Sequence, residues 1–416
     1  MLRFGAVFAV FSFARRSFAA FVPLCGLLLL GSGCALVRMS NSPPVRTVRV
    51  RVVADSGFAE NTVWKTNAQT LIDAASDHFT SWFNIALAID TMQIWDFTQS
   101  DCYDSMFEWD CLSNAVGPGS SDIVVLFTKA SSRHDFTIAG FGQYETGCIR
   151  VAQADWHHVR GGFEYAFLTL IHELGHLFGA FHVFHDDVRK EHHVMNPALS
   201  HKLLTKKGTE TELLVPEWHP ANRTIVRALL HRPFHDSDWN AGHWPAIERA
   251  YQQVRREFIG FAVDERGQVV RHALNALSQT EYFYYLSSWA AMCGMDSCAL
   301  LYVDSLATVL RAIEATCRNC GSNCQARMCL HMGYRFGRSA DWLDNRLAYY
   351  HLKKAHILLS VAEDDAEEEY ETFVELLPKM SAAHKRKFRA AFELHHDRIR
   401  ARQDDTQTAP AKGGIP

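Results

Sequence analysis

The segment HELGHLFGAFH, residues 172–182, constrains the fold more than any other part of this sequence. The first seven residues of this segment belong to a stretch from Phe163 to Phe178 whose apolar residues have the spacing of a helix. Side chains four positions apart on a helix lie one turn apart on the same face. We therefore expect His172 and His176 to point in the same direction, so that both imidazoles can bind one ion.

The third histidine of the segment, His182, requires a break in that helix. It lies six positions after His176 and would point to the wrong face of a continuous helix. Gly179 can adopt a positive φ without the steric penalty of a Cβ atom, so the chain can turn there and return His182 to the same ion. Three imidazole ligands with a fourth position open for water are typical of catalytic zinc sites.

Glu173 follows the first histidine directly, where its carboxylate can hold a water molecule beside the ion. Zinc lowers the pKa of such a water towards about 7 and polarises the carbonyl group of a substrate. A neighbouring carboxylate can then accept the proton of the water. The pattern therefore predicts one catalytic Zn²⁺ and a zinc-dependent endopeptidase with Glu173 as general base. Three alternatives stay open: histidines that bind nothing, an inactive metal-containing scaffold or binding protein, and a zinc amidase acting on a cell-envelope substrate.

The run from His172 to His182 resembles the extended zinc motif of the metzincin metallopeptidases at every fixed position. Further along the chain, the residues VMNP at 194–197 are similar to the Met-turn of that family. The resemblance implies that Met195 packs beneath the three imidazoles without binding zinc. It also implies that residues 138–151 lie near the edge strand along which a peptide or protein substrate binds.

Two positions depart from the better-known branches of this family. Val183 follows the third histidine, where Asp, Ser, Glu or Pro is usual. Pro197 stands where astacin-like and serralysin-like members carry a tyrosine. The segment from Asp122 to Phe127 loosely resembles the reprolysin-like (adamalysin) branch. The subfamily and the substrate therefore stay open.

The first half of the chain mixes strand and helix patterns. Alternating or continuous apolar runs predict strands at residues 48–52, 85–94 and 123–127, with an irregular edge strand or hairpin within 138–151. Helical spacing of apolar residues is found at residues 61–83, 163–178 and 221–230. This order indicates an α+β fold. Together with the resemblance, it predicts a metzincin-like catalytic domain over residues 45–235, with a twisted mixed sheet and zinc in a cleft.

Beyond residue 235 the strand patterns almost vanish. Helical spacing of apolar residues recurs at residues 244–261, 274–291, 299–315, 341–361 and 383–400. We therefore expect an all-α domain over residues 236–401, a helical bundle or a repeat-like array that can bind protein partners. An acidic run at residues 363–371 is typical of a solvated helix face or loop. Residues 402–416 are polar and are expected to be disordered.

The N-terminal residues 1–34 have the composition of an export signal. Three arginines, the last of them Arg16, precede an apolar run that ends in LLLLGSGC. Cys34 would carry the lipid of a bacterial lipoprotein, although Gly31 stands where that motif usually has leucine. Lipidation, plain cleavage and an uncleaved signal anchor all stay open. We expect an exported protein, either attached to the membrane of a bacterial-type cell envelope or secreted.

Cysteine content and net charge bear on the compartment and the partners. The chain has 11 cysteines, and an oxidising compartment favours disulfides, with Cys102–Cys111 as a plausible local bridge. Disulfides, buried thiols and a second metal site all stay open for the cluster of cysteines between residues 317 and 329. The formal net charge is −4, from 42 basic and 46 acidic residues, so we expect no nucleic-acid partner.

Overall fold

The computed structural model describes residues 45–95, 119–129, 140–143, 147–152, 162–184, 193–195, 217–235, 238–255, 262–271, 273–320, 339–358 and 361–379. The predicted export signal, the predicted helix at residues 383–400 and the predicted tail lie outside these ranges. So do Cys102, Cys111, and the last two residues of the predicted cysteine cluster, Cys324 and Cys329. The disulfide and lipidation predictions therefore stay predictions.

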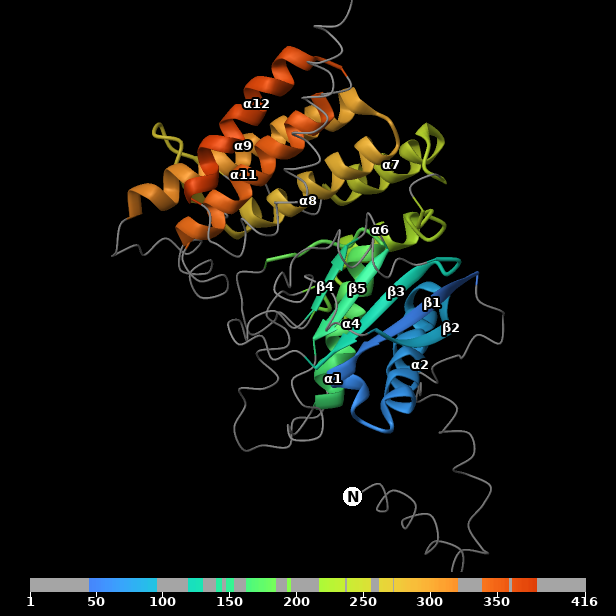
Figure 1. The fold of residues 1–416 in the computed structure, drawn as a ribbon. Coiled ribbons are helices and arrows are strands. Elements are labelled where there is room, and N and C mark those ends of the chain that lie inside the picture. The colour runs from blue at the N-terminus through green and yellow to red at the C-terminus, as the bar shows by residue number, and fades with distance from the viewer. Residues whose placement is uncertain are drawn as a thin grey trace, which may run out of the picture. The chain divides into compact units, whose positions relative to one another are not determined.

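A twisted five-stranded sheet forms the centre of the first half of the chain (Figure 1). Its strands are β1 (Arg46–Asp55), β2 (Ile85–Trp95), β3 (Ile123–Thr128), β4 (Gly140–Gln143) and β5 (Cys148–Ala152), in the order β2-β1-β3-β5-β4. Neighbouring strands are parallel, except that β4 runs antiparallel to β5 at the edge. All six residues of β3 are buried, which explains the continuous apolar run of this strand.

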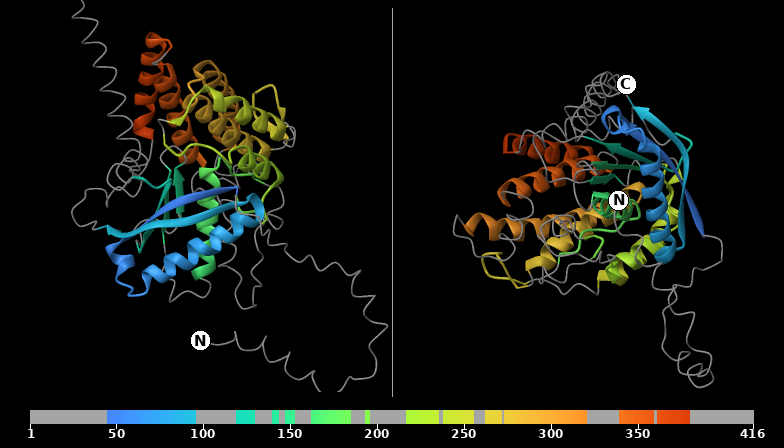
Figure 2. Two further views of the ribbon diagram at one scale, coloured as in Figure 1. Left: turned by 90° about the vertical axis from the view of Figure 1, so that its right-hand side faces the viewer. Right: turned by 90° about the horizontal axis from the view of Figure 1, so that it is seen from below.

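Two long helices, α2 (Trp64–Phe83) and α4 (Gly162–Leu177), cover one face of this sheet and contact each other (Figures 1 and 2). The apolar face of α2 buries Leu71, Ile72 and Phe79 completely, and each such side chain contributes about 1.5–3 kcal/mol by leaving water. The helix ends at Phe83 because Asn84 adopts a left-handed φ of 58°, after which β2 begins at once.

The opposite face of the sheet carries a smaller apolar cluster of Val53, Val124, Leu126 and Cys148, with Trp95 packed against it. Alternate residues of the same strands therefore point into two separate apolar regions. The larger one, towards the helices, includes Val50, Val52, Ile123 and Val125 and continues into the rest of the chain. The predicted α+β class of the first half is confirmed.

The second half of the described chain is almost entirely helical. It contains α6 (Pro220–Ala228), η4 (Ala241–His243), α7 (Trp244–Arg255), α8 (Ala273–Met292), α9 (Asp296–Cys320), α11 (Ser339–Leu358), α12 (Glu363–Leu376) and η6 (Leu377–Lys379). Gly294 has a φ of +71° in the turn that joins α8 to α9, and the two helices then pack along each other. A helical region after the α+β part is confirmed, whereas the boundary at residue 235 stays a prediction.

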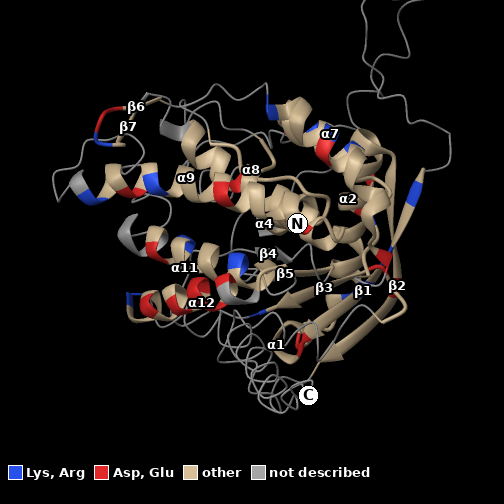
Figure 3. Ribbon diagram, turned by 90° about the horizontal axis from the view of Figure 1, so that it is seen from above, with Lys and Arg blue, Asp and Glu red and all other residues tan. Residues whose placement is uncertain are grey.

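Two local features add detail to the predicted all-α region. A short antiparallel hairpin of β6 (Ala262–Val263) and β7 (Val269–Arg271), which the sequence does not predict, lies between α7 and α8. Its turn is held by Asp264, whose carboxylate accepts hydrogen bonds from the backbone N–H groups of Arg266 and Gln268. The predicted acidic run, residues 363–371, forms most of α12, and acidic residues lie along this helix (Figure 3).

No helix within the described ranges is both long and apolar enough to cross a bilayer.

A buried histidine–tryptophan pair links α2 to the chain before α6. His78 on α2 is 7% exposed, and its Nε2 accepts a hydrogen bond from Nε1 of Trp218 at 2.9 Å. The indole packs edge-on against Phe79 and Phe83, with ring centroids 5.5 and 5.0 Å away. Burial lowers the pKa of His78 to about 4, so the ring is neutral at pH 7 and its Nε2 can accept the indole proton.

This pair should make the stability of the protein depend on pH. Below its ordinary pKa of 6.5 the unfolded chain binds a proton at residue 78 that the folded chain excludes until about pH 4. The free energy of unfolding should therefore fall by up to about 3 kcal/mol from this group as the pH drops through that window. His78→Gln retains an acceptor for the indole and does not titrate. Urea unfolding at several pH values should show a shallower fall for the variant, and identical pH profiles would contradict this account.

Candidate metal centre

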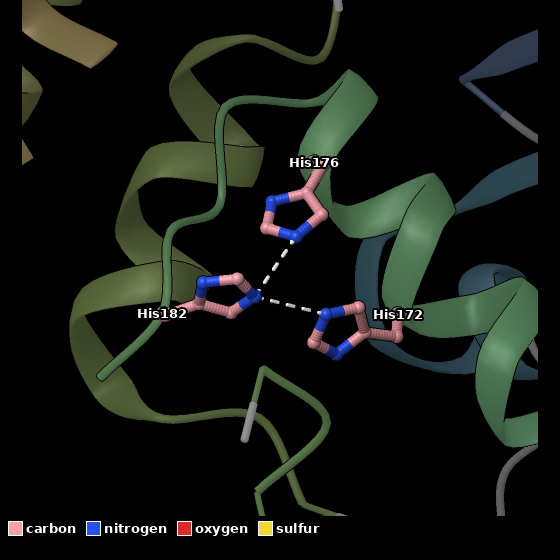
Figure 4. A group of neighbouring side chains, drawn as sticks. All are labelled: His172, His176 and His182. Carbon is pink, nitrogen blue, oxygen red and sulfur yellow. Dashed lines mark hydrogen bonds between the residues drawn. The ribbon is translucent and has the colours of Figure 1, made fainter. Parts of the chain in front are cut away.

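Three histidine side chains converge at the end of α4. His172 and His176 lie on that helix, and His182 comes from the chain that follows it (Figure 4). Nε2 of His182 lies 3.1 Å from Nε2 of His172 and 3.2 Å from Nε2 of His176. A tetrahedral zinc ion with Zn–N distances of about 2.0–2.1 Å separates its ligand nitrogens by about 3.3–3.4 Å. The spacing of the three nitrogens therefore suits one zinc ion.

The other nitrogen of each helical histidine is fixed by a backbone carbonyl. Nδ1 of His172 lies 2.7 Å from the carbonyl oxygen of Val194, and Nδ1 of His176 lies 2.9 Å from that of Ala180. Because a carbonyl oxygen can only accept, each Nδ1 carries the proton and donates it, which leaves a lone pair on Nε2. Burial lowers the pKa of His172 to about 4 and that of His176 well below its usual value. Both rings are therefore neutral, as metal ligands must be.

The turn after α4 forms at the predicted glycine. Gly179 has a φ of +78°, and its N–H bonds to the carbonyl oxygen of His176 at 2.9 Å. A Cβ atom on Gly179 would lie 2.3 Å from Cδ1 of Leu229, and any other residue would also be strained by the positive φ. The carbonyl oxygen of Gly179 accepts a hydrogen bond from the hydroxyl of Tyr251 on α7. The predicted break in the helix is thus present, and it returns His182 to the other two rings.

The predicted Met-turn residue lies beneath α4. Met195 is 1% exposed, and a Cβ atom on Gly175 would stand 2.5 Å from its sulfur and 2.9 Å from the ring of Trp218. The glycine inside the histidine segment therefore lets the methionine and the indole approach the helix closely. The N–H of Val194 bonds to the carbonyl oxygen of Glu217, which ties the methionine segment to the chain beside Trp218. Asn196 and Pro197, the rest of the predicted turn, lie outside the described residues.

Glu173, the predicted general base, is buried on α4 next to the first histidine, with 5% of its surface exposed. A buried carboxylate needs nearby polar groups. The charge of Glu173 is one of the causes, after burial and the charge of Glu281, that raise the pKa of Tyr285 well above its usual range. The phenol of Tyr285, on α8, is therefore neutral.

Sequence reasoning missed two groups of α8 that contact the histidines. The hydroxyl of Tyr285 lies 2.6 Å from Nδ1 of His176, and a carboxylate oxygen of Glu281 lies 3.8 Å from Nδ1 of His182. Both α8 residues are about one hundred positions from their partners, so no local pattern connects them. The one available signal is a glutamate within a largely apolar helix, four positions before a tyrosine on the same face.

The sequence of residues 45–201 matches the family model described as Metallo-peptidase family M12, and the three converging histidines lie within the matched segment. Residues 45–201 are therefore similar to the metallopeptidases of family M12, and we call them the M12 domain. The predicted resemblance to reprolysin-like metallopeptidases is thereby confirmed. The M12 match ends before α6, so it covers the sheet, α2, α4 and the Met-turn segment but none of the later helices.

Comparison with other proteins adds little to this assignment. A search of curated proteins found no match for the chain. Among solved structures, archaemetzincin from Methanopyrus kandleri matches at 16% sequence identity and a TM-score of 0.32, over 45% of this chain and 97% of that chain.

Replacing Gly179 by alanine should disturb the M12 site through two separate effects. The positive φ is strained for alanine, and the new methyl group collides with Leu229, so the free energy of unfolding should fall by about 2–4 kcal/mol. Gly294→Ala is the matched control, because Gly294 has a φ of +71° but no atom within 4 Å of the added carbon. That control should lose only about 1 kcal/mol.

Urea unfolding of the two variants measures the difference, and zinc content measures its effect on the site. Gly179→Ala should also hold less zinc, because the turn positions His182. Equal stability losses in the two variants, with unchanged zinc content in both, would contradict the role assigned to this turn.

Proposed function

We propose that the M12 domain is a zinc-dependent endopeptidase that hydrolyses peptide bonds in peptides or proteins. The observation that carries this proposal is the convergence of three imidazole nitrogens, two of which belong to rings whose protons are fixed on the opposite nitrogen. His172, His176 and His182 would hold one Zn²⁺ and leave a fourth position open to water. When bound, the ion supplies a Lewis acid that lowers the pKa of water and polarises a carbonyl.

Glu173 has the role of general base in this proposal. Its carboxylate accepts a proton from the attacking water as a C–O bond forms at the carbonyl carbon of the substrate. It then passes that proton to the departing amine nitrogen as the C–N bond breaks. The position of Glu173 supports this role, because it is buried on α4 directly after the first of the three histidines. Met195 has no chemical step and packs against the floor of the site at Gly175.

Strand β4 is the proposed docking edge for substrate. It lies at the end of the sheet order and, within the described strands, pairs only with β5. An extended peptide can add to such an edge through backbone hydrogen bonds, which accept many side-chain sequences. An endopeptidase that binds substrate in this way recognises the extended chain as well as the residues beside the cleaved bond.

The N-terminal sequence supports a proposal about location. Residues 1–34 have the pattern of an export signal, so we propose that the enzyme acts outside the cytoplasm, either secreted or attached to the membrane of a cell envelope. Mass spectrometry of the protein recovered from its native cells tests this. A mature chain that begins at Cys34 with bound lipid would support attachment, whereas an intact and soluble N-terminus would contradict export.

Glu173→Gln tests the base. The amide cannot accept the proton, so turnover of a peptide library should fall by about 10²–10⁴-fold while the zinc content stays unchanged. Glu164→Gln is the control, because Glu164 lies in the first turn of the same helix, two turns before the histidines, and should retain activity. Undiminished cleavage by purified Glu173→Gln would refute the assignment.

His182→Ala tests the third ligand. Loss of this imidazole leaves only the two helical histidines, so bound zinc should fall well below about one ion per chain, with cleavage lost. His231→Ala removes an exposed histidine that follows the end of α6 and should leave the zinc content unchanged. Elemental analysis and peptide cleavage, with and without a chelator, measure both effects.

Unchanged zinc stoichiometry in His182→Ala would contradict the three-ligand site. Zinc binding without any chelator-sensitive cleavage of the library would instead favour a metal-containing scaffold. Cleavage of peptidoglycan fragments but not of peptides would favour an amidase.

A further inference from the structure

One face of α8 carries three polar side chains that all reach the segment holding the metal centre. Ser278, Glu281 and Tyr285 are spaced by three and four positions, so they lie in a row along one side of the helix. They form what we call the α8 polar face. Ser278 is 1% exposed, Glu281 is 4% exposed and Tyr285 is 5% exposed. Polar groups buried to this degree are stabilised only by specific partners.

Each member of the α8 polar face contacts a different part of the histidine segment. The hydroxyl of Ser278 accepts a hydrogen bond from the backbone N–H of Phe184 at 3.0 Å, two residues after His182. The carboxylate of Glu281 lies 3.8 Å from Nδ1 of His182. The hydroxyl of Tyr285 lies 2.6 Å from Nδ1 of His176. Along α8, the contacts of Ser278, Glu281 and Tyr285 therefore run from the residues after His182 back to His176.

The two contacts to imidazoles are on the side of each ring that points away from the other histidines. Nε2 of His176 and Nε2 of His182 face each other at 3.2 Å, whereas Tyr285 and Glu281 meet the Nδ1 atoms. A hydrogen-bond acceptor or a negative charge at Nδ1 keeps the proton there and leaves Nε2 free to bind a metal. It also fixes the rotation of the ring.

The carboxylate of Glu281 is itself anchored from a second helix. Arg346 on α11 donates a hydrogen bond to one oxygen of Glu281, and the other oxygen is the one nearest His182. At 3.8 Å the carboxylate is too far from Nδ1 of His182 for a hydrogen bond, but its negative charge favours a proton on that nitrogen. A chain of charged and polar groups thus leads from α11 through α8 to the third histidine.

We infer that Glu281 and Tyr285 are positioning residues for the zinc ligands, so that the helical region after residue 235 completes the metal centre of the M12 domain. Neither residue touches substrate in this account. They act through His182 and His176 by holding each ring with its Nε2 directed to the ion. This inference rests on the proposed function, because it assigns a role towards the same zinc ion.

The test is the zinc affinity of the full-length protein, measured by competition with a chromophoric chelator. Tyr285→Phe removes one hydroxyl, and Glu281→Gln removes the charge while preserving the size of the side chain. Each should raise the dissociation constant for zinc by about 10–100-fold. The visible absorption spectrum of the Co²⁺-substituted protein should also change in each variant, because the ligand geometry changes.

The chain offers a matched control for each substitution. Tyr284→Phe removes the hydroxyl of the neighbouring tyrosine, which bonds to the hydroxyl of Tyr349 on α11. Glu248→Gln alters a carboxylate on α7 that accepts a hydrogen bond from Tyr302. Both controls should bind zinc within about a factor of two of the parent and preserve the Co²⁺ spectrum.

The possible results separate this inference from the proposed function. Failure of the parent protein to bind zinc would overturn the proposed function itself. A parent that binds zinc, with Tyr285→Phe and Glu281→Gln unchanged in both affinity and Co²⁺ spectrum, would overturn only the positioning role. If Tyr285→Phe does not fold by circular dichroism, Glu281→Gln and Arg346→Gln decide the question with the same two measurements, since Arg346→Gln removes the anchor of the carboxylate.

Discussion

Mutual repulsion between imidazole lone pairs is the constraint on which this site depends. Three Nε2 atoms face one point, with two of the separations at 3.1 and 3.2 Å. Such an arrangement suits neutral rings that bind one shared cation. Burial keeps His172 and His176 neutral, and the carbonyls of Val194 and Ala180 hold their protons on the opposite nitrogen. The surrounding fold holds the three rings in place against the repulsion between their lone pairs.

This support comes from parts of the chain that are distant in sequence. The sheet and α2 support α4 from one side, with the hydrogen-bonded pair of His78 and Trp218 packed below it. Trp218 and Met195 reach the helix because Gly175 has no side chain. From the other side, α7 bonds to the turn at Gly179, and α8 contacts the segment that follows. The histidines are therefore held by several elements, and the helical region is part of this support.

The sequence was enough to predict the features that depend on local geometry. Two histidines four positions apart on a helix must share a face, and Gly179 alone can supply the turn that returns the third. Strands and helices followed from apolar spacing, and the hairpin of β6 and β7 was missed because each strand has only two or three residues. The contacts of Glu281 and Tyr285 could not be predicted, because the sequence pattern around the histidines does not indicate which distant helix packs against them. The same holds for His78 and Trp218, which are 140 positions apart.

X-ray absorption at the zinc edge of the purified, zinc-loaded protein tests the central claim most directly. The account predicts about three imidazole nitrogens at about 2.0–2.1 Å from the metal, with one further light ligand completing four-coordination. A spectrum dominated by sulfur ligands, or a protein that retains no zinc after loading, would contradict it.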